Sequence, residues 1–120
     1  MVEFEDSSFN NIIRQIIKKS LFTERQIQII LNRKNLSEFD FGISKGAYFR
    51  QVSQSRDKLM GLYYSIVLLR GLGVLLPDDV DVISRLAEQV SVIKNNDVFP
   101  EREEQVMDVI DKLVRQACGM

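Results

Sequence analysis

Histidine and tryptophan are absent from this chain, and cysteine occurs once, as Cys118 near the C-terminus. Without histidine, neither a Ser–His–Asp nor a Cys–His nucleophilic site can form, and Cys/His zinc sites are excluded with them. A single cysteine excludes any disulfide within the chain and fits a reducing compartment. A catalytic pair of carboxylates stays open after these absences, but no pattern in the chain singles one out. We expect no enzyme, no cofactor and no metal site.

The composition is that of one soluble globular domain. The chain has 120 residues, of which 45% are hydrophobic and 28% are charged, which is enough for one modest core. Residues 1–8 carry three acids and no base, so they lack the basic and apolar regions of a secretory leader. We expect a single cytoplasmic domain over residues 1–120.

The net charge of −1 hides a strong asymmetry along the chain. Residues 9–70 hold eleven Lys and Arg against four Asp and Glu, a local charge of +7, whereas residues 71–120 hold five bases against ten acids. This distribution suggests that the first half faces a polyanion. The alternative is that the basic half packs beside the acidic half in a neutral particle, and charge alone leaves both open.

Helical periodicity predicts an all-α fold. Apolar residues recur at helical spacing in about five segments, over residues 9–19, 24–34, 45–70, 77–94 and 100–118. Thr23 and Ser44 are the expected N-caps of the second and third helices, and Pro77 and Pro100 open the last two. The last helix is expected to bury Val106, Val109, Ile110, Leu113, Val114 and Ala117.

The most apolar stretch, residues 59–76, raises the question of a membrane. Arg70 and three glycines interrupt it, whereas a membrane-spanning helix needs a longer and cleaner run. We interpret it as a long buried helix without membrane contact. Because it is hydrophobic nearly all round, either the later helices or a second subunit must cover it. We favour a homodimer whose interface includes Leu62, Ile66, Leu68 and Leu69.

Three short motifs follow one another within residues 21–59. They are TERQ at residues 23–26, ISKGA at 43–47 and SQSRDKL at 53–59. In this order they resemble the helix-turn-helix of sigma-factor region four and of related regulators. That family opens a helix with TERQ, turns with I-S-x-G-[TA] and ends its recognition helix with S-x-[AS]-R-x-K-L. The chain departs from the family between the motifs, because residues 32–42 are too few for the full intervening helix of the family.

The resemblance implies a DNA-binding protein that regulates transcription. The helix-turn-helix part would be residues 9–59, and residues 60–120 would form a helical dimerisation part. The all-α fold would then consist of a helix-turn-helix followed by the long apolar helix and two C-terminal helices. The implied partners are double-stranded DNA and a second copy of the chain.

The helix that begins after Ser44 divides into an inner and an outer face. The inner face carries Tyr48, Val52, Ser55 and Leu59. The opposite face is free for side chains that hydrogen-bond base edges, such as Arg on guanine and Gln on adenine. In its N-terminal turns we predict base contacts by Lys45, Phe49, Arg50, Gln51 and Gln54. Cations nearby suit phosphates, for which a charge suffices, and these are Arg25, Arg33, Lys34, Arg56 and Lys58.

Other interpretations of the same residues stay open. The polar side chains could form an ordinary solvated face, since long polar residues are mostly exposed. Phe49 is unusual on such a face, and a buried contact with another helix suits it better than a thymine methyl group. The rival function is an all-helical protein-interaction adaptor that docks an acidic partner on the basic half and binds no nucleic acid.

Overall fold

The computed structural model describes residues 9–96 and 98–120. Within these residues it contains helices and no strand. The helices are α1 (Asn11–Lys19), α2 (Glu24–Arg33), α3 (Lys45–Gly71), α4 (Pro77–Ile93) and α5 (Pro100–Cys118). The all-α class and the five helical segments expected from periodicity are confirmed.

Side chains at the expected positions begin the second and third helices. Thr23 Oγ1 accepts a hydrogen bond from the Gln26 amide at 3.1 Å, and Gln26 Oε1 accepts one from the Thr23 amide at 2.9 Å. This is the capping box that TERQ predicts. Ser44 Oγ caps α3 by accepting from the amide three residues further on, at 3.1 Å. Pro77 and Pro100 begin α4 and α5 with acids in the first turn, where the helix dipole favours negative charge.

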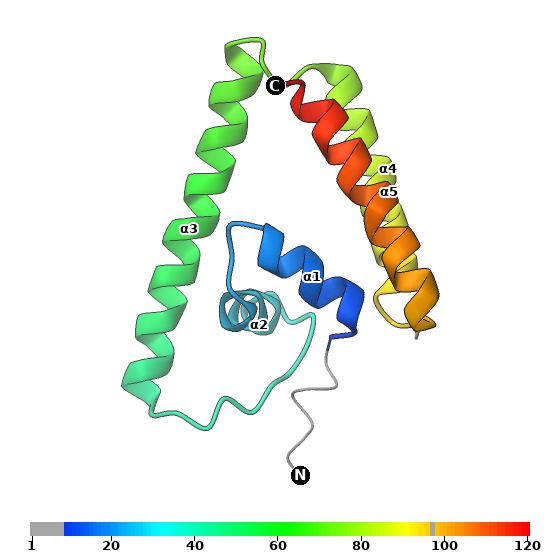
Figure 1. Ribbon diagram of the computed structural model, residues 1–120. Coiled ribbons are helices and arrows are strands. Elements are labelled where there is room, and N and C mark those ends of the chain that lie inside the picture. Colours follow the sequence, from blue (N-terminus) through cyan, green and yellow to red (C-terminus); the bar gives the residue numbers. More distant parts are fainter. Residues whose placement is uncertain (1–8, 97) are drawn as a thin grey trace.

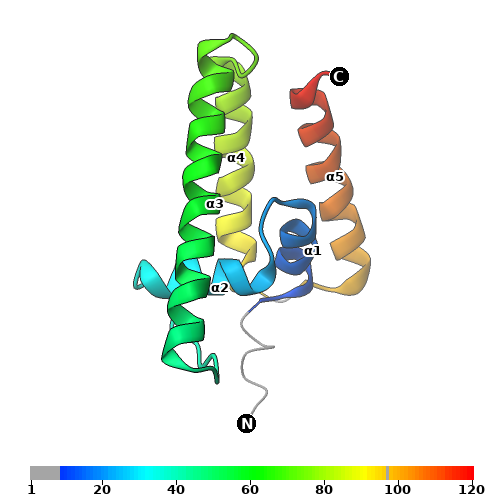
Figure 2. The ribbon, with the colours of Figure 1, turned by 90° about the vertical axis from the view of Figure 1, so that its left-hand side faces the viewer.

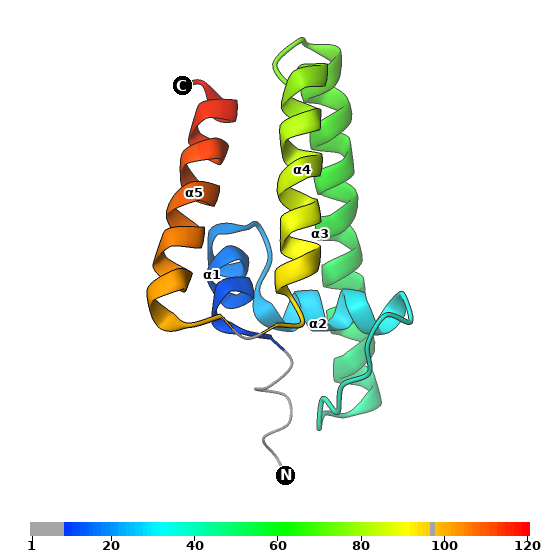
Figure 3. The same cartoon turned by 90° about the vertical axis from the view of Figure 1, so that its right-hand side faces the viewer.

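The helices form two arms that meet at a tip (Figure 1). One arm is α3, and the other consists of α4 and α5, which run antiparallel in contact with each other. At the end away from the tip, α2 crosses α3, and α1 packs against both α2 and α5. The side views in Figures 2 and 3 show the C-terminal half of α3 extending well beyond α1 and α2.

The core is small and lies away from the tip. Its fully buried apolar side chains come from α1, α2, α3 and α5, and are Ile12, Ile17, Ile29, Val52 and Met107. The radius of gyration is 16.1 Å, against about 13.6 Å for a compact domain of 120 residues. The chain is therefore less compact than a domain of the same length whose helices all share one core.

The expectation of a long buried apolar helix is not supported. Residues 60–71 form the C-terminal half of α3, in continuation of its polar first half through Gly61, and their large apolar side chains are exposed, apart from the half-buried Leu62. None of the described helices combines the length and apolar character needed to cross a membrane.

The buried face of α5 differs from the one expected. Val109 and Val114 are exposed, whereas Met107 is buried. The reason is that α5 packs on two neighbours, α1 and α4. Met107 faces α1, where it lies beside Gln15 and Lys19, whereas Val109 lines the groove between α4 and α5 and stays exposed there. The expected apolar stripe of α5 follows from periodicity alone, which assumes a single neighbouring helix. It therefore leaves out Met107, which a second neighbour buries.

Asn10 joins α1 to the end of α4. Its Oδ1 caps α1 by accepting from the Ile13 amide at 2.9 Å. Its Nδ2 donates to the carbonyl oxygens of Ile93 and Asn96, at 2.9 and 3.1 Å. One side chain therefore begins a helix and ties the base of the second arm to it.

We expect Asn10→Ala to lower the free energy of unfolding by about 2 kcal/mol, about half from the lost cap and half from the lost tie. Asn10→Ser can still cap α1 but cannot reach both carbonyls, so it should lose only about 1 kcal/mol. Urea denaturation of the two variants measures the difference. A serine variant as stable as the parent would show that the tie contributes nothing.

Candidate nucleic-acid interface

The inner face of α3 packs on α2 as its spacing predicts. Val52 and Ser55 are buried, with Ser55 only 1% exposed, and Ile29 of α2 is buried with them. Tyr48 and Leu59, at the two ends of the same face, are half-buried. The first four turns of α3 are thus held against α2 along one side only, which leaves the other side uncovered.

The outer face of α3 carries the side chains predicted to contact bases. Lys45, Arg50 and Gln54 are exposed. Gln51 lies at the flank and is half-buried, with its Oε1 shielded from solvent and without a hydrogen-bond partner in the described chain. Asp57 is the only acid in residues 45–60. It lies beyond the N-terminal turns, so these turns present donors and no carboxylate.

The cations predicted to contact phosphates lie on α2, at its C-terminus and on α3, and all five are exposed. The Arg25 guanidinium lies 5.3 Å from the ring centre of Phe41, and Lys58 Nζ lies 3.5 Å from Gln26 Oε1.

The salt bridges of the described residues use other cations, namely Arg14, Lys19 and Arg115. Together with Lys45 and Arg50, seven cations of this region therefore make no ion pair within the described chain. They are Arg25, Arg33, Lys34, Lys45, Arg50, Arg56 and Lys58.

Phe49 is not buried, contrary to the expectation from its residue type. Its side chain is 45% exposed because it lies at the edge of the α3 face that packs on α2 and not within that face. It stacks edge-on against Tyr48, with ring centres 5.2 Å apart. The Arg33 guanidinium of α2 lies 5.9 Å from its ring centre, within the range of a cation–π interaction. Contact with another helix is therefore present, but through a cation at the surface.

The link between α2 and α3 contains no helix. Residues 34–44 form an irregular segment. Two of its aromatic side chains contact other parts of the structure: one packs against α3, and the other packs against the residues before α1. Phe41 lies 5.5 Å from Tyr48, and Phe39 lies 6.0 Å from Phe41 and 6.2 Å from Phe9, measured between ring centres. Tyr48 also donates a hydrogen bond to Asn32 Oδ1 at the end of α2. The link is longer than the three or four residues of a standard helix-turn-helix, but it is anchored at both ends.

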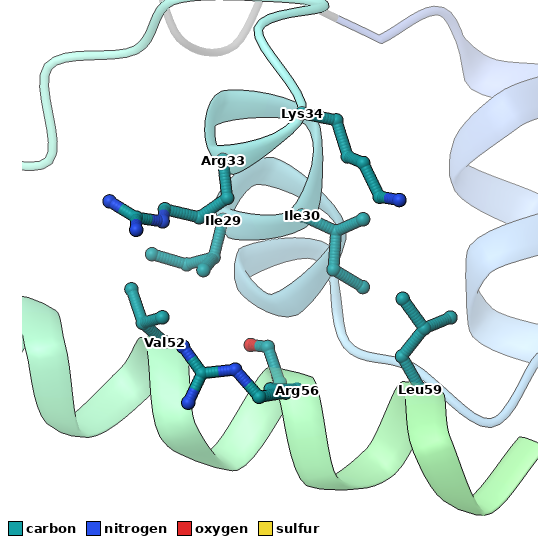
Figure 4. Close-up of a pocket in the computed structure, with 8 residues that line it drawn as sticks. Ile29, Ile30, Arg33, Lys34, Val52, Arg56 and Leu59 are labelled. Carbon is teal, nitrogen blue, oxygen red and sulfur yellow. The ribbon is translucent and has the colours of Figure 1, made fainter.

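A shallow pocket of about 160 Å³ lies where α2 crosses α3. Figure 4 shows Ile29 above Val52, with Arg33 and Arg56 reaching the same side of the pocket from facing helices and Lys34 reaching the other side. Three of the predicted phosphate-binding cations therefore surround one hydrophobic junction. The sequence alone does not indicate this convergence, because it depends on how α2 crosses α3.

Ser55 lies in this junction with a hydroxyl that has no hydrogen-bond partner in the described chain. An unsatisfied buried hydroxyl costs about 1–3 kcal/mol, and alanine is also the better helix former. We expect Ser55→Ala to raise the free energy of unfolding by about 1 kcal/mol, measured by urea denaturation. A loss of stability would mean that the hydroxyl has a partner that this arrangement does not reveal.

The residues predicted for a dimer interface lie on the other half of α3, towards the tip. Leu62 is half-buried, and Ile66, Leu68 and Leu69 are exposed. The candidate DNA-binding face and the candidate dimer face thus follow each other along one continuous helix, and neither covers the other.

Comparison of the chain with protein-family models, with curated proteins and with solved structures finds no match. Within the described residues, no group of three or more acidic or cysteine side chains is placed to hold a metal ion.

Proposed function

We propose that this chain is a sequence-specific DNA-binding protein that regulates transcription as a homodimer. The observation that carries the proposal is the set of seven exposed cations on α2 and on the N-terminal half of α3 that make no ion pair in the described chain. They surround an α3 face of hydrogen-bond donors that no other element covers. Unpaired cations in such a cluster are the electrostatic footprint of a nucleic-acid surface.

The proposed mechanism uses α3 as the recognition helix. Its N-terminal turns enter the major groove, where Arg50 can bond guanine O6 and N7, and Gln54 can bond adenine N6 and N7. α2 lies across α3, and Ile29 and Val52 are buried where the two helices cross, which keeps α3 at a fixed angle. Arg33, Lys34 and Arg56 then neutralise backbone phosphates beside the groove and set the register without reading sequence.

The proposed dimer accounts for the other half of α3. Leu68 and its apolar neighbours are too exposed for a protein that stays monomeric in water. A two-fold dimer would present two recognition helices to a palindromic site.

Titration of random-sequence duplex at several salt concentrations tests the proposal. If five cations per subunit contact phosphates, log K should fall with log[salt] at a slope of about −4.5 per subunit, or roughly 500-fold between 50 and 200 mM salt. No binding, or binding that is independent of salt, would instead favour the protein-interaction adaptor.

Lys34→Ala should weaken binding to every duplex alike and reduce the salt slope by about one unit, because Lys34 is assigned to a phosphate. Lys112→Ala is the matched control, since Lys112 is an exposed lysine on α5. It should change neither the affinity for DNA nor the salt slope. If both variants and the parent show the same dependence of log K on log[salt], Lys34 does not contact a phosphate.

A further inference from the structure

The C-terminal half of α3 is uncovered on every side. Each large apolar side chain from Met60 to Leu72 is at least 38% exposed, with the single exception of Leu62. Successive residues of a helix point 100° apart, so Tyr63, Tyr64 and Val67 face different directions from Ile66 and Leu69. A helix that is hydrophobic all round is stable in water only when other elements surround it.

The second arm also has an apolar face without a partner. α4 turns Val82 and Leu86 towards α5, where they line the groove between the two helices. Val80 and Ile83 lie on a different side of α4 and are exposed. α4 therefore carries two apolar faces, and α5 covers only one of them.

Both ends of the structure hold the arms apart. At the tip, the amides of Val74 and Leu75 donate to the Leu69 carbonyl at 2.9 and 3.1 Å. Arg70 Nη1 donates to the Leu75 carbonyl at 3.0 Å, and Gly73 adopts a φ of 81° that suits glycine.

At the base, α1 acts as a spacer. Asn10 ties it to the end of α4, and Lys19 Nζ lies 3.6 Å from Asp111 Oδ1 of α5. Closing α3 of one chain onto its own α4 would displace α1 from these contacts, so the two apolar faces do not cover each other within the chain.

The uncovered surface has the size of a stable interface. The accessible area is 9003 Å², whereas a compact chain of 13.9 kDa exposes about 6,700 Å². Residues 1–8, outside the described part, could add at most about 1,300 Å² if fully exposed. About 1,000 Å² of excess remains, above the roughly 800 Å² that one partner buries in a standard stable interface.

We infer that the exposed apolar faces of α3 and α4 receive the apolar half of α3 of a second copy, and that the exchange is reciprocal. Each α3 then contacts the partner's α4 as well as the partner's α3. A simple seam between two α3 helices would cover only one stripe of each, which leaves the remaining sides exposed. The same chain supplies both the inserted helix and the receiving face, as a two-fold contact requires. The inference rests on the homodimer of the proposed function and adds the surfaces that meet.

Cross-linking between differently labelled copies tests this arrangement. In a Cys118→Ser background, one chain carries Val67→Cys and the other Ile83→Cys. Both positions are exposed, so each variant should fold. After mixing and re-equilibration, a short bis-maleimide should join the two chains, and peptide mass spectrometry should identify the link between positions 67 and 83. A third chain carrying Asp57→Cys is the control. It should not be joined to position 83, because Asp57 lies on the half of α3 that remains outside.

Two results would overturn the inference. Links only between two copies of position 67 would show a plain α3 seam, and a Cys118→Ser parent that sediments as a monomer would remove the second copy altogether. The expected links in a protein that binds no DNA would keep the inference and reject the DNA-binding part of the proposed function.

Discussion

Leu68→Glu is expected to convert the protein from a dimer into a monomer. The parent should sediment at about twice the chain mass of 13.9 kDa at micromolar concentration. Leu68 is 57% exposed in the single chain, so glutamate costs little there, but the dimer would bury its carboxylate without a partner. That penalty is several kcal/mol, and about 3 kcal/mol already raises the dimer dissociation constant by more than 100-fold.

The control for this substitution is Leu36→Glu. Leu36 is also exposed, at 70%, but it lies in the link between α2 and α3, at the end of the molecule opposite the tip (Figure 1). It should leave the dimer intact and so shows that an added negative charge alone is not responsible. A parent that sediments as a folded monomer at every concentration, or a Leu68→Glu variant that stays dimeric, would contradict the assignment.

Arg50→Ala is expected to weaken sequence-specific DNA binding and to leave nonspecific DNA binding unchanged. If the Arg50 guanidinium bonds a guanine edge, its loss should cost about 1–3 kcal/mol on the preferred duplex, selected from a random pool, and almost nothing on random DNA. Arg50 is exposed and makes no ion pair in the described chain, so the free energy of unfolding should change by no more than ~0.5 kcal/mol. Competition binding with the two duplexes, together with urea denaturation, gives both quantities.

Arg102→Ala provides the comparison, because Arg102 is an exposed arginine on α5, far from the proposed interface. It should leave both affinities unchanged. An Arg50→Ala variant that binds its preferred duplex as tightly as the parent does would show that α3 is not the recognition helix. If the Arg50→Ala variant is unfolded, Arg50 stabilises the fold and does not serve DNA recognition.

Local features of the fold could be predicted well. The capping box at Thr23 and the cap at Ser44 involve residues three apart, so short-range chemistry decides them. The inner face of α3 follows from the helical period, and Val52 and Ser55 are buried as expected. The exposed positions of Arg50 and Gln54 follow from the same period.

The candidate site could be predicted only in part. Its residue types and their place on α3 follow from the sequence, but the convergence of Arg33, Lys34 and Arg56 around one pocket depends on the crossing of α2 over α3. The burial expected for Phe49 was wrong for the same reason, because the crossing of α2 leaves Phe49 at the edge of the covered face. Whether these groups bind DNA stays a prediction.

The sequence by itself determined where the helices begin and end and how apolar residues are distributed around each, because caps and periodicity act over three or four residues. Only the tertiary structure decided which apolar sides are covered. Met107 is buried and Val109 is not because α1 and α4 approach α5 from two directions. The apolar half of α3 stays uncovered because α1 and the turn at the tip hold the arms apart. Burial depends on contacts between residues distant in the chain, and the period of one helix carries no information about its neighbours.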